Sequence, residues 1–167
     1  TCSAITICEE MRKYYDMMGL KKKIIVICSK QLQENFKNQI FNEDKLPERP
    51  INGYWDLKTC VGSKLLKEIN PTHIKNLSRK KVRRYINRII KTGYKFYGYI
   101  EFKNRMHEVI FGGNKGGRKV LSTDSQEIID EKKKYNIKRK YSNCTLVIDE
   151  IHNLRVENVR NKIELKL

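Results

Sequence analysis

The chain lacks any apolar run approaching the roughly 18 to 20 residues that a bilayer-spanning helix needs, and no signal peptide opens it. We therefore expect a soluble, intracellular protein without a membrane partner. Its five cysteines form no CxxC pair and no metal-ligand spacing, which argues against a zinc site. Several of them sit inside apolar runs, so we expect all five to be reduced, small and buried.

Acidic residues are also scarce. Nineteen Asp and Glu stand against 36 Lys and Arg, which gives a net charge of +17 in 167 residues. A positive field of this size favours a polyanionic partner, either nucleic acid or an acidic membrane surface. The length suits a single domain, residues 1–167, because a chain of this size buries about 70% of its unfolded surface on folding.

One stretch organises the rest of the sequence. Residues Thr145–Ile148 are apolar or β-branched, which predicts a buried strand, and the run stops at Asp149 and Glu150. Open α/β sheets bind ligands at the carboxyl ends of their strands. There Asp149 could hold magnesium through its water shell, and Glu150 could orient or deprotonate the water that attacks a γ-phosphate. The alternative for a bare Asp-Glu pair is a solvated acidic turn.

The order Asp149–His152 after a hydrophobic strand resembles motif II, the Walker B box, of superfamily 2 helicases with a DExH signature. The continuation Asn153–Arg155 resembles the form in the Swi/Snf-like helicases and early-transcription ATPases of large nucleocytoplasmic DNA viruses. The resemblance implies a three-layer RecA-like (P-loop NTPase) α/β domain with a mostly parallel sheet, ATP and Mg²⁺ as cofactors, and DNA rather than RNA as partner. It implies Asp149 and Glu150 as catalytic residues and His152 as the link between the nucleotide and nucleic-acid sites. A viral source would imply the virus factory in the host cytoplasm, or the virion.

In that superfamily the first helix follows a phosphate loop ending in Gly-Lys-Thr or Gly-Lys-Ser. The resemblance implies that Thr1 is the loop hydroxyl, which binds the nucleotide and ligates magnesium together with Asp149. The alternative is an ordinary helix N-cap. The chain is accordingly expected to be a fragment of the first lobe, incomplete at both ends. Without the Gly-Lys pair and the second RecA-like lobe of the same polypeptide, the fragment is expected to be inactive alone.

A second apolar run, Ile24–Cys28, predicts a parallel strand, and Ser29 is placed to cap the helix that follows. This strand, turn and helix resemble motif Ia of the superfamily, which contacts the phosphate backbone of the bound strand. The resemblance implies that Ser29 and Lys30 bind nucleic acid. The family often has proline in this turn, and this chain has none. A helix N-terminus with a solvated lysine is the alternative.

Residues 42–92 predict a loop and a basic helical insertion. Two prolines mark the loop, and residues 63–92 hold ten bases against the single acid Glu68. Ser78 is a plausible N-cap of the basic helix. We expect a nucleic-acid contact there, with Arg79 and Arg83 as ligands, or alternatively only a solvated face. Earlier in the insertion, Trp55 could stack on a base, but it is expected to anchor its loop onto the core.

The glycine-rich stretch 112–119 is not a Walker A box, because Arg118 and Lys119 occupy the positions that require Lys and then Ser or Thr. A mobile basic loop is expected instead. Residues 122–136 predict a helix with Ser125 as a possible cap, and residues 132–140 predict a basic surface turn.

Three functions remain open on this evidence. The first is an ATP-dependent helicase or translocase, in which hydrolysis depends on Glu150. The second is a non-catalytic nucleic-acid-binding module, whose binding would fall steeply with salt and ignore ATP. The third is a transcription-factor subunit that keeps the fold without turnover.

Overall fold

The computed structural model describes residues 2–72, 76–113 and 116–154. Within these ranges the chain forms six α-helices and a three-stranded parallel sheet, which confirms the predicted α/β class with a parallel sheet. No helix in the described ranges is long and apolar enough to cross a membrane. In chain order the elements are α1 (Cys2–Met17), β1 (Ile24–Ile27), α2 (Lys30–Ile40), the 3₁₀ helix η1 (Glu43–Lys45), α3 (Gly62–Ile69), α4 (Arg79–Gly93), β2 (Tyr94–Tyr97), α5 (Tyr99–Ile110), α6 (Gln126–Tyr141), β3 (Leu146–Ile148) and the 3₁₀ helix η2 (Ile151–Leu154).

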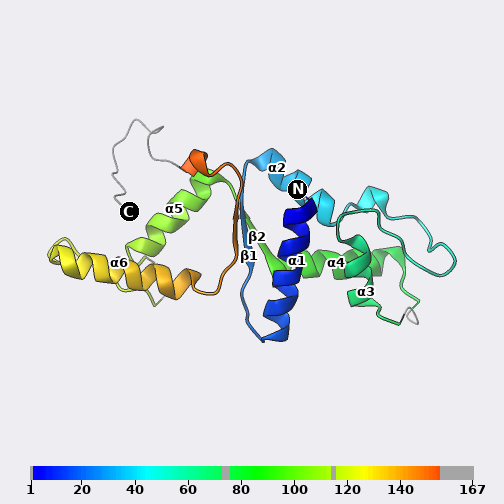
Figure 1. Ribbon diagram of the computed structural model, residues 1–167, viewed down its shortest axis with the longest axis horizontal. Coiled ribbons are helices and arrows are strands. Elements are labelled where there is room, and N and C mark those ends of the chain that lie inside the picture. The colour runs from blue at the N-terminus through cyan, green and yellow to red at the C-terminus, as the bar shows by residue number, and fades with distance from the viewer. Residues whose placement is uncertain (1, 73–75, 114–115, 155–167) are drawn as a thin grey trace.

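The sheet has the order β2-β1-β3, so β1 is central and all four of its residues are buried. Alternate side chains of β1 enter two separate cores. Ile24 and Val26 pack with helices α1 to α4, whereas Ile25 and Ile27 pack with α5 and the end of α6. Figure 1 shows α1, α3 and α4 on one side of the sheet and α5 and α6 on the other. The helices and the sheet therefore form three layers.

Strand β3 is less buried than its sequence predicts. Leu146 is 42% exposed, and Val147 and Ile148 are only half-buried. The reason is the position of β3 at the edge of the sheet, where β1 is its only strand neighbour among the described residues. The apolar run correctly predicted a strand, but its position in the sheet depends on strand order, which a run of side chains does not encode.

Local side chains account for several element ends, and the predictions for Ser29, Ser78 and Trp55 are confirmed. Gly19 ends α1 with a φ of 65°, a left-handed conformation that glycine adopts without strain. The hydroxyl of Ser29 caps α2 by accepting a hydrogen bond from the Leu32 amide, 3.4 Å away. Trp55 is half-buried against the core and donates its indole N–H to the Leu77 carbonyl at 3.0 Å, so it anchors its loop as predicted. Ser78 occupies the N-cap position of α4, without a side-chain capping bond.

The chain after residue 110 differs from the prediction. Helix α6 continues to Tyr141, so the basic turn expected at residues 132–140 is wrong. The end of the glycine-rich segment at Arg118 is hydrogen-bonded to helix α6. The buried Asn136 side chain accepts from the Arg118 amide at 2.7 Å and donates to the Arg118 carbonyl at 2.8 Å. These hydrogen bonds join residues 18 positions apart in the sequence, so no local sequence pattern reveals them.

A buried ion cluster joins α1, α3 and β2. Glu9 is fully buried, and its carboxylate accepts from the Arg12 guanidinium at 2.9 Å and from the Tyr94 hydroxyl at 2.5 Å. Arg12 also pairs with Glu68 at 2.5 Å and with Asp16 at 3.0 Å. Burial opposes the charge on Arg12, but bonds to Glu68 and Glu9 outweigh it and raise its pKa. Helical spacing within α1 was the only sequence signal of this cluster.

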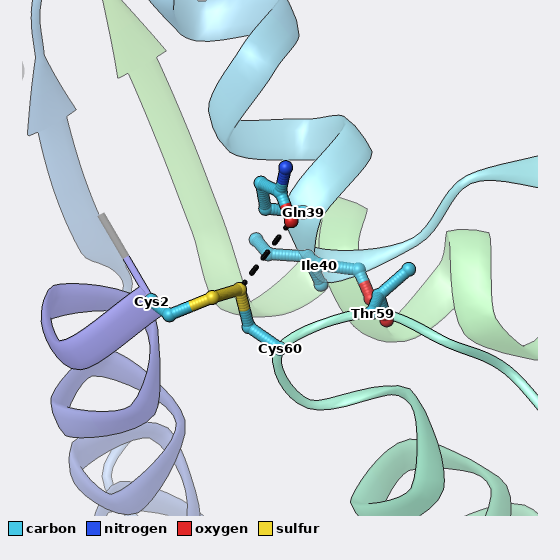
Figure 2. The surroundings of a disulfide bond; sticks show 5 residues. All are labelled: Cys2, Gln39, Ile40, Thr59 and Cys60. Carbon is cyan, nitrogen blue, oxygen red and sulfur yellow. Dashed lines mark hydrogen bonds between the residues drawn. A yellow bond between two sulfur atoms is a disulfide. The ribbon is translucent and has the colours of Figure 1, made fainter.

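Cys2 and Cys60 form a disulfide, with Cα atoms 5.4 Å apart (Figure 2). The prediction that all five cysteines are reduced is therefore wrong for this pair, and it holds for Cys8, Cys28 and Cys144. The bond links the start of α1 to the loop before α3, across a sequence separation of 58. Sequence spacing could not reveal it, because the pairing depends on how α1 packs beside that loop.

Substituting Cys60 by serine is expected to lower the free energy of unfolding by up to about 4 kcal/mol, because the disulfide closes a long loop in the unfolded chain. The measurement is thermal unfolding with and without a thiol reductant. Reductant should lower the Tm of the wild type and of Cys144→Ser, but leave that of Cys60→Ser unchanged. An equal response of wild type and Cys60→Ser to reductant would show that the disulfide does not stabilise the fold.

Candidate functional site

Three chain segments converge at the carboxyl edge of the sheet. The register pairs Ile27 of β1 with both Tyr97 of β2 and Ile148 of β3, so all three strands end at the same level. Helix α2 begins at Lys30, three residues after β1, and α5 begins two residues after β2. The amino-terminal N–H groups of two helices therefore lie at the edge where the acids after β3 emerge, an arrangement that favours anions.

Asp149 is the first residue beyond β3, and its backbone is fixed on both sides. Its amide donates to the Ile27 carbonyl at 3.0 Å, and its carbonyl accepts from the Tyr99 hydroxyl at 2.9 Å. Its side chain is exposed at the edge. Burial and, after it, the nearby Asp149 charge raise the pKa of the Cys28 thiol at the end of β1.

Glu150 has a left-handed backbone, with a φ of 51°. The other non-glycine residues with positive φ in the described ranges are Asn52 and Asn143, and asparagine tolerates this region. For glutamate the conformation costs about 1–2 kcal/mol. Residues held in such conformations cluster at functional sites. The turn directs the chain from β3 into η2, where the Asn153 amide donates to the Glu150 carbonyl at 2.9 Å.

His152 lies beside Glu150, with its Nδ1 atom 3.1 Å from Glu150 Oε2. The two side chains are 62% and 58% exposed, so the pair contributes little to stability. The position of the pair matters for function. His152, which the resemblance implies as the coupling residue, is in contact with Glu150, the acid predicted to orient water.

Ser29 and Lys30 lie at the neighbouring strand end. The Ser29 oxygen accepts the capping bond, which leaves its O–H proton available to a ligand. The Lys30 side chain is exposed, and it has no partner within the described part of the chain. Both residues are thus placed where a polyanion could meet them beside Asp149.

Arg79 and Arg83 lie elsewhere. Arg79 donates to the backbone carbonyls of Glu43 and Leu46, the shortest bond being 2.9 Å, and Arg83 pairs with the Glu43 carboxylate at 3.2 Å. These contacts are beyond the carboxyl end of α2, whereas Ser29 and Lys30 are at its amino end. The length of α2, about 15 Å for 11 residues, separates the two pairs. Arg79 thus serves at least to hold the 43–46 segment.

The donor set at the edge suits magnesium in one respect. Magnesium is commonly held by one or two carboxylates, with substrate phosphates and water completing its octahedron, and Asp149 supplies one exposed carboxylate. The described residues contain no group of three or more His, Cys, Asp or Glu that could hold a metal by themselves. The second predicted magnesium ligand, Thr1, lies outside the described residues, as does Arg155.

Two residues at the edge were not predicted as site residues. Tyr99 donates a hydrogen bond to the Asp149 carbonyl, and Cys28 is buried directly after β1. The available signal for Tyr99 was its place directly after the aromatic strand 94–97. Its contact with the end of β3 follows from the sheet order, which brings both strand ends next to β1.

Comparisons with protein-family models, curated proteins and solved structures found no match to this chain. The functional assignment therefore depends on the residues at the carboxyl edge and on the distribution of charge.

Proposed function

We propose that this chain is part of the first RecA-like lobe of a superfamily 2 ATP-dependent nucleic-acid helicase or translocase. One observation carries the proposal. The segment Asp149–His152 and the Ser29–Lys30 turn, which resemble motifs II and Ia, follow strands that are direct neighbours in a parallel sheet covered on both faces. A nucleotide site and a nucleic-acid contact that must communicate would need this proximity.

The residues take the following roles in the proposal. Asp149 holds a hydrated magnesium ion, and Glu150 accepts a hydrogen bond from the attacking water and orients it. When bound, ATP would supply the phosphoanhydride, and Mg²⁺ would neutralise part of its negative charge. His152 is in contact with Glu150 and couples ATP hydrolysis at Glu150 to the contact with the polynucleotide. Ser29 and Lys30 bind the phosphate backbone, and Thr1 contributes the hydroxyl of a phosphate loop.

The rest of the assembly follows from the same resemblance. A second RecA-like lobe of the same polypeptide would complete the nucleotide site and make movement along the strand possible. Residues 42–92 would be an insertion within the first lobe. DNA is proposed as the polynucleotide.

Substitution of Asp149 by asparagine should weaken magnesium-dependent ATP binding at least tenfold in the full natural polypeptide, because the metal loses its carboxylate. Binding is measured by titration with a fluorescent ATP analogue, with and without Mg²⁺. The matched control is Asp130→Asn, which removes an exposed acid from α6. Equal affinities of Asp149→Asn and the control for Mg²⁺–ATP would contradict the proposal.

A second candidate is a nucleic-acid-binding module without turnover. The observation that favours it is the basic surface of α4, which faces solvent and does not involve the acids after β3. In that case nucleic-acid binding would be indifferent to ATP and to the Asp149 substitution.

A further inference from the structure

Helix α4 carries a row of bases that face away from the protein. Its buried side chains, Val82 and Ile86, lie on one face, and at 100° per residue the opposite face carries only positive charge over its length. We call this row the α4 ridge. Its members are exposed, and they have no ion pair within the described part of the chain: Lys80, Lys81, Arg84, Arg88 and Lys91.

The distribution of charge along α4 is unfavourable for the stability of the helix. Arg79, Lys80 and Lys81 place three cations in the first turn, where the helix dipole favours anions, and the turn contains no acid. Lys80, Arg84 and Arg88 are spaced i, i+4 and i+8, and like charges at this spacing destabilise a helix by about 0.2–0.5 kcal/mol per pair. Helix α6 follows the rule, with an acid in its first turn and bases in its last. Local violations of this kind mark functional surfaces.

A second basic segment continues the ridge. Lys21, Lys22 and Lys23 precede β1, and the Lys23 ammonium donates to the Lys91 carbonyl at 3.0 Å, at the last turn of α4. This contact satisfies one of the carbonyls left free at a helix end. A cavity of about 470 Å³ lies beside the two segments and the end of α1, and one acid is among its lining residues. The lining residues are Arg12, Asp16, Gly19, Leu20, Lys21, Lys22, Lys23, Thr92 and Gly93. The bases of two segments some 70 residues apart thus form one surface.

This surface is not at the carboxyl edge. Lys23 precedes the first residue of β1, and α4 leads directly into the first residue of β2, so the two segments meet at the amino edge of the sheet. The helix reaches away from the sheet in Figure 1. Asp149, Glu150 and Lys30 lie at the opposite ends of the strands.

We infer that the α4 ridge and Lys21–Lys23 bind the phosphodiester backbone of a nucleic acid, at a surface separate from the contact proposed at Ser29 and Lys30. The ridge spans about 17 Å, a length that covers several successive phosphates of one strand. It offers charge, whereas Asn87, at its margin, already donates to Glu43 at 3.3 Å. Contacts with the phosphodiester backbone carry no sequence information, so this binding should not depend on the base sequence.

The test is a triple substitution, Lys80→Gln with Arg84→Gln and Arg88→Gln, matched by Lys134→Gln with Lys138→Gln and Lys140→Gln on α6. Both variants lose three exposed positive charges from a helix surface. Binding of a labelled 20-base-pair duplex is measured by fluorescence anisotropy, without nucleotide, over a series of salt concentrations. Circular dichroism checks that both variants are folded.

The ridge variant should bind at least tenfold more weakly than wild type at about 0.1 M salt, and its salt slope should fall by about 2 to 3, because each lost phosphate contact contributes about 0.9. The control should change less than threefold. Equal losses in both variants, or no loss in the ridge variant, would overturn the inference. So would a ridge variant that loses affinity for polyglutamate but not for DNA, which would identify an acidic protein as the partner.

The inference shares only its nucleic-acid partner with the proposed ATPase, and it rests on the same α4 surface as the second candidate function. The assay contains no ATP and leaves Asp149 and Glu150 unaltered. Failure of the ridge would leave the ATPase proposal standing, and an inactive ATPase site would leave the ridge result unaffected.

Discussion

Truncating Arg12 to alanine is expected to lower the free energy of unfolding by about 3–5 kcal/mol, because it leaves a buried carboxylate without its cationic partner. Arg12 is 6% exposed, and Glu9 beside it is fully buried. Without the guanidinium, Glu9 would keep one neutral donor, the Tyr94 hydroxyl, against the full cost of burying its charge. Since whole domains are stable by only about 5–15 kcal/mol, much of the protein should be unfolded.

The matched control for Arg12 is Lys64→Ala. Lys64 pairs with Glu10 at 2.6 Å, and it also joins α1 to α3, as the Arg12–Glu68 pair does. Both partners of the Lys64 pair are exposed, so its loss should cost less than about 1 kcal/mol. Urea denaturation measures both variants. Equal destabilisation by the two substitutions would show that burial of the Arg12 cluster is not what makes it important.

Gly93 provides an independent check on the same cluster. A Cβ atom at this position would lie 2.5 Å from the Arg12 Cδ atom, in the middle of a side chain held at its far end by three carboxylates. Arg12 therefore cannot move aside without losing ion pairs. Gly93→Ala should share the destabilisation of Arg12→Ala, and the two effects should not add in the double variant, because they act on one contact.

Replacing Glu150 by glutamine should reduce nucleic-acid-stimulated ATP hydrolysis at least 100-fold in the full natural polypeptide, within the 10²–10⁴ range that general acid–base groups contribute. Glutamine keeps the size of the side chain and removes the charge that orients water. Binding of Mg²⁺–ATP should persist, because Asp149 is untouched. The measurement is steady-state phosphate release with and without DNA, and Glu131→Gln on α6 is the exposed-acid control. Turnover at the wild-type rate in Glu150→Gln would remove the catalytic claim.

Because Glu150 has a left-handed backbone, two substitutions at this position distinguish a loss of catalysis from a loss of stability. Glutamine retains the strain, so Glu150→Gln should leave the free energy of unfolding unchanged. Glu150→Gly should abolish hydrolysis equally and yet raise stability by up to about 1 kcal/mol, since glycine adopts a φ of 51° without a Cβ clash. A less stable Glu150→Gly variant would show that the turn is not strained.

The elements that the sequence predicted are those with a local cause. Helix α1 ends at Gly19 and Ser29 caps α2, because glycine and serine act on their own backbone within a few residues. The apolar run at residues 24–28 could only be a covered strand. The acids after residue 148 were placed at a strand end for the same reason.

Side-chain identity was a weaker guide to partners. Arg79 and Arg83 were selected as nucleic-acid ligands from charge density alone, yet both contact the 43–46 segment. The arginines and lysines of α4 that lack ion pairs in the described part of the chain are those on the face that does not pack against neighbouring elements. Tyr85 of the same helix is 41% exposed, although tyrosine is often an apolar contact.

The sequence by itself determined the α/β class, the strand ends and the positive charge, because these follow from short-range periodicity and composition. Only the tertiary structure decided that β3 is an edge strand, that Cys2 pairs with Cys60, and that Arg12 is buried among three carboxylates. It alone joined Lys23 to the end of α4. Apart from the Arg12 bonds to Glu9 and Asp16 within α1, these contacts link different segments of the chain, and their distances are set by how the helices pack on the sheet rather than by any local preference.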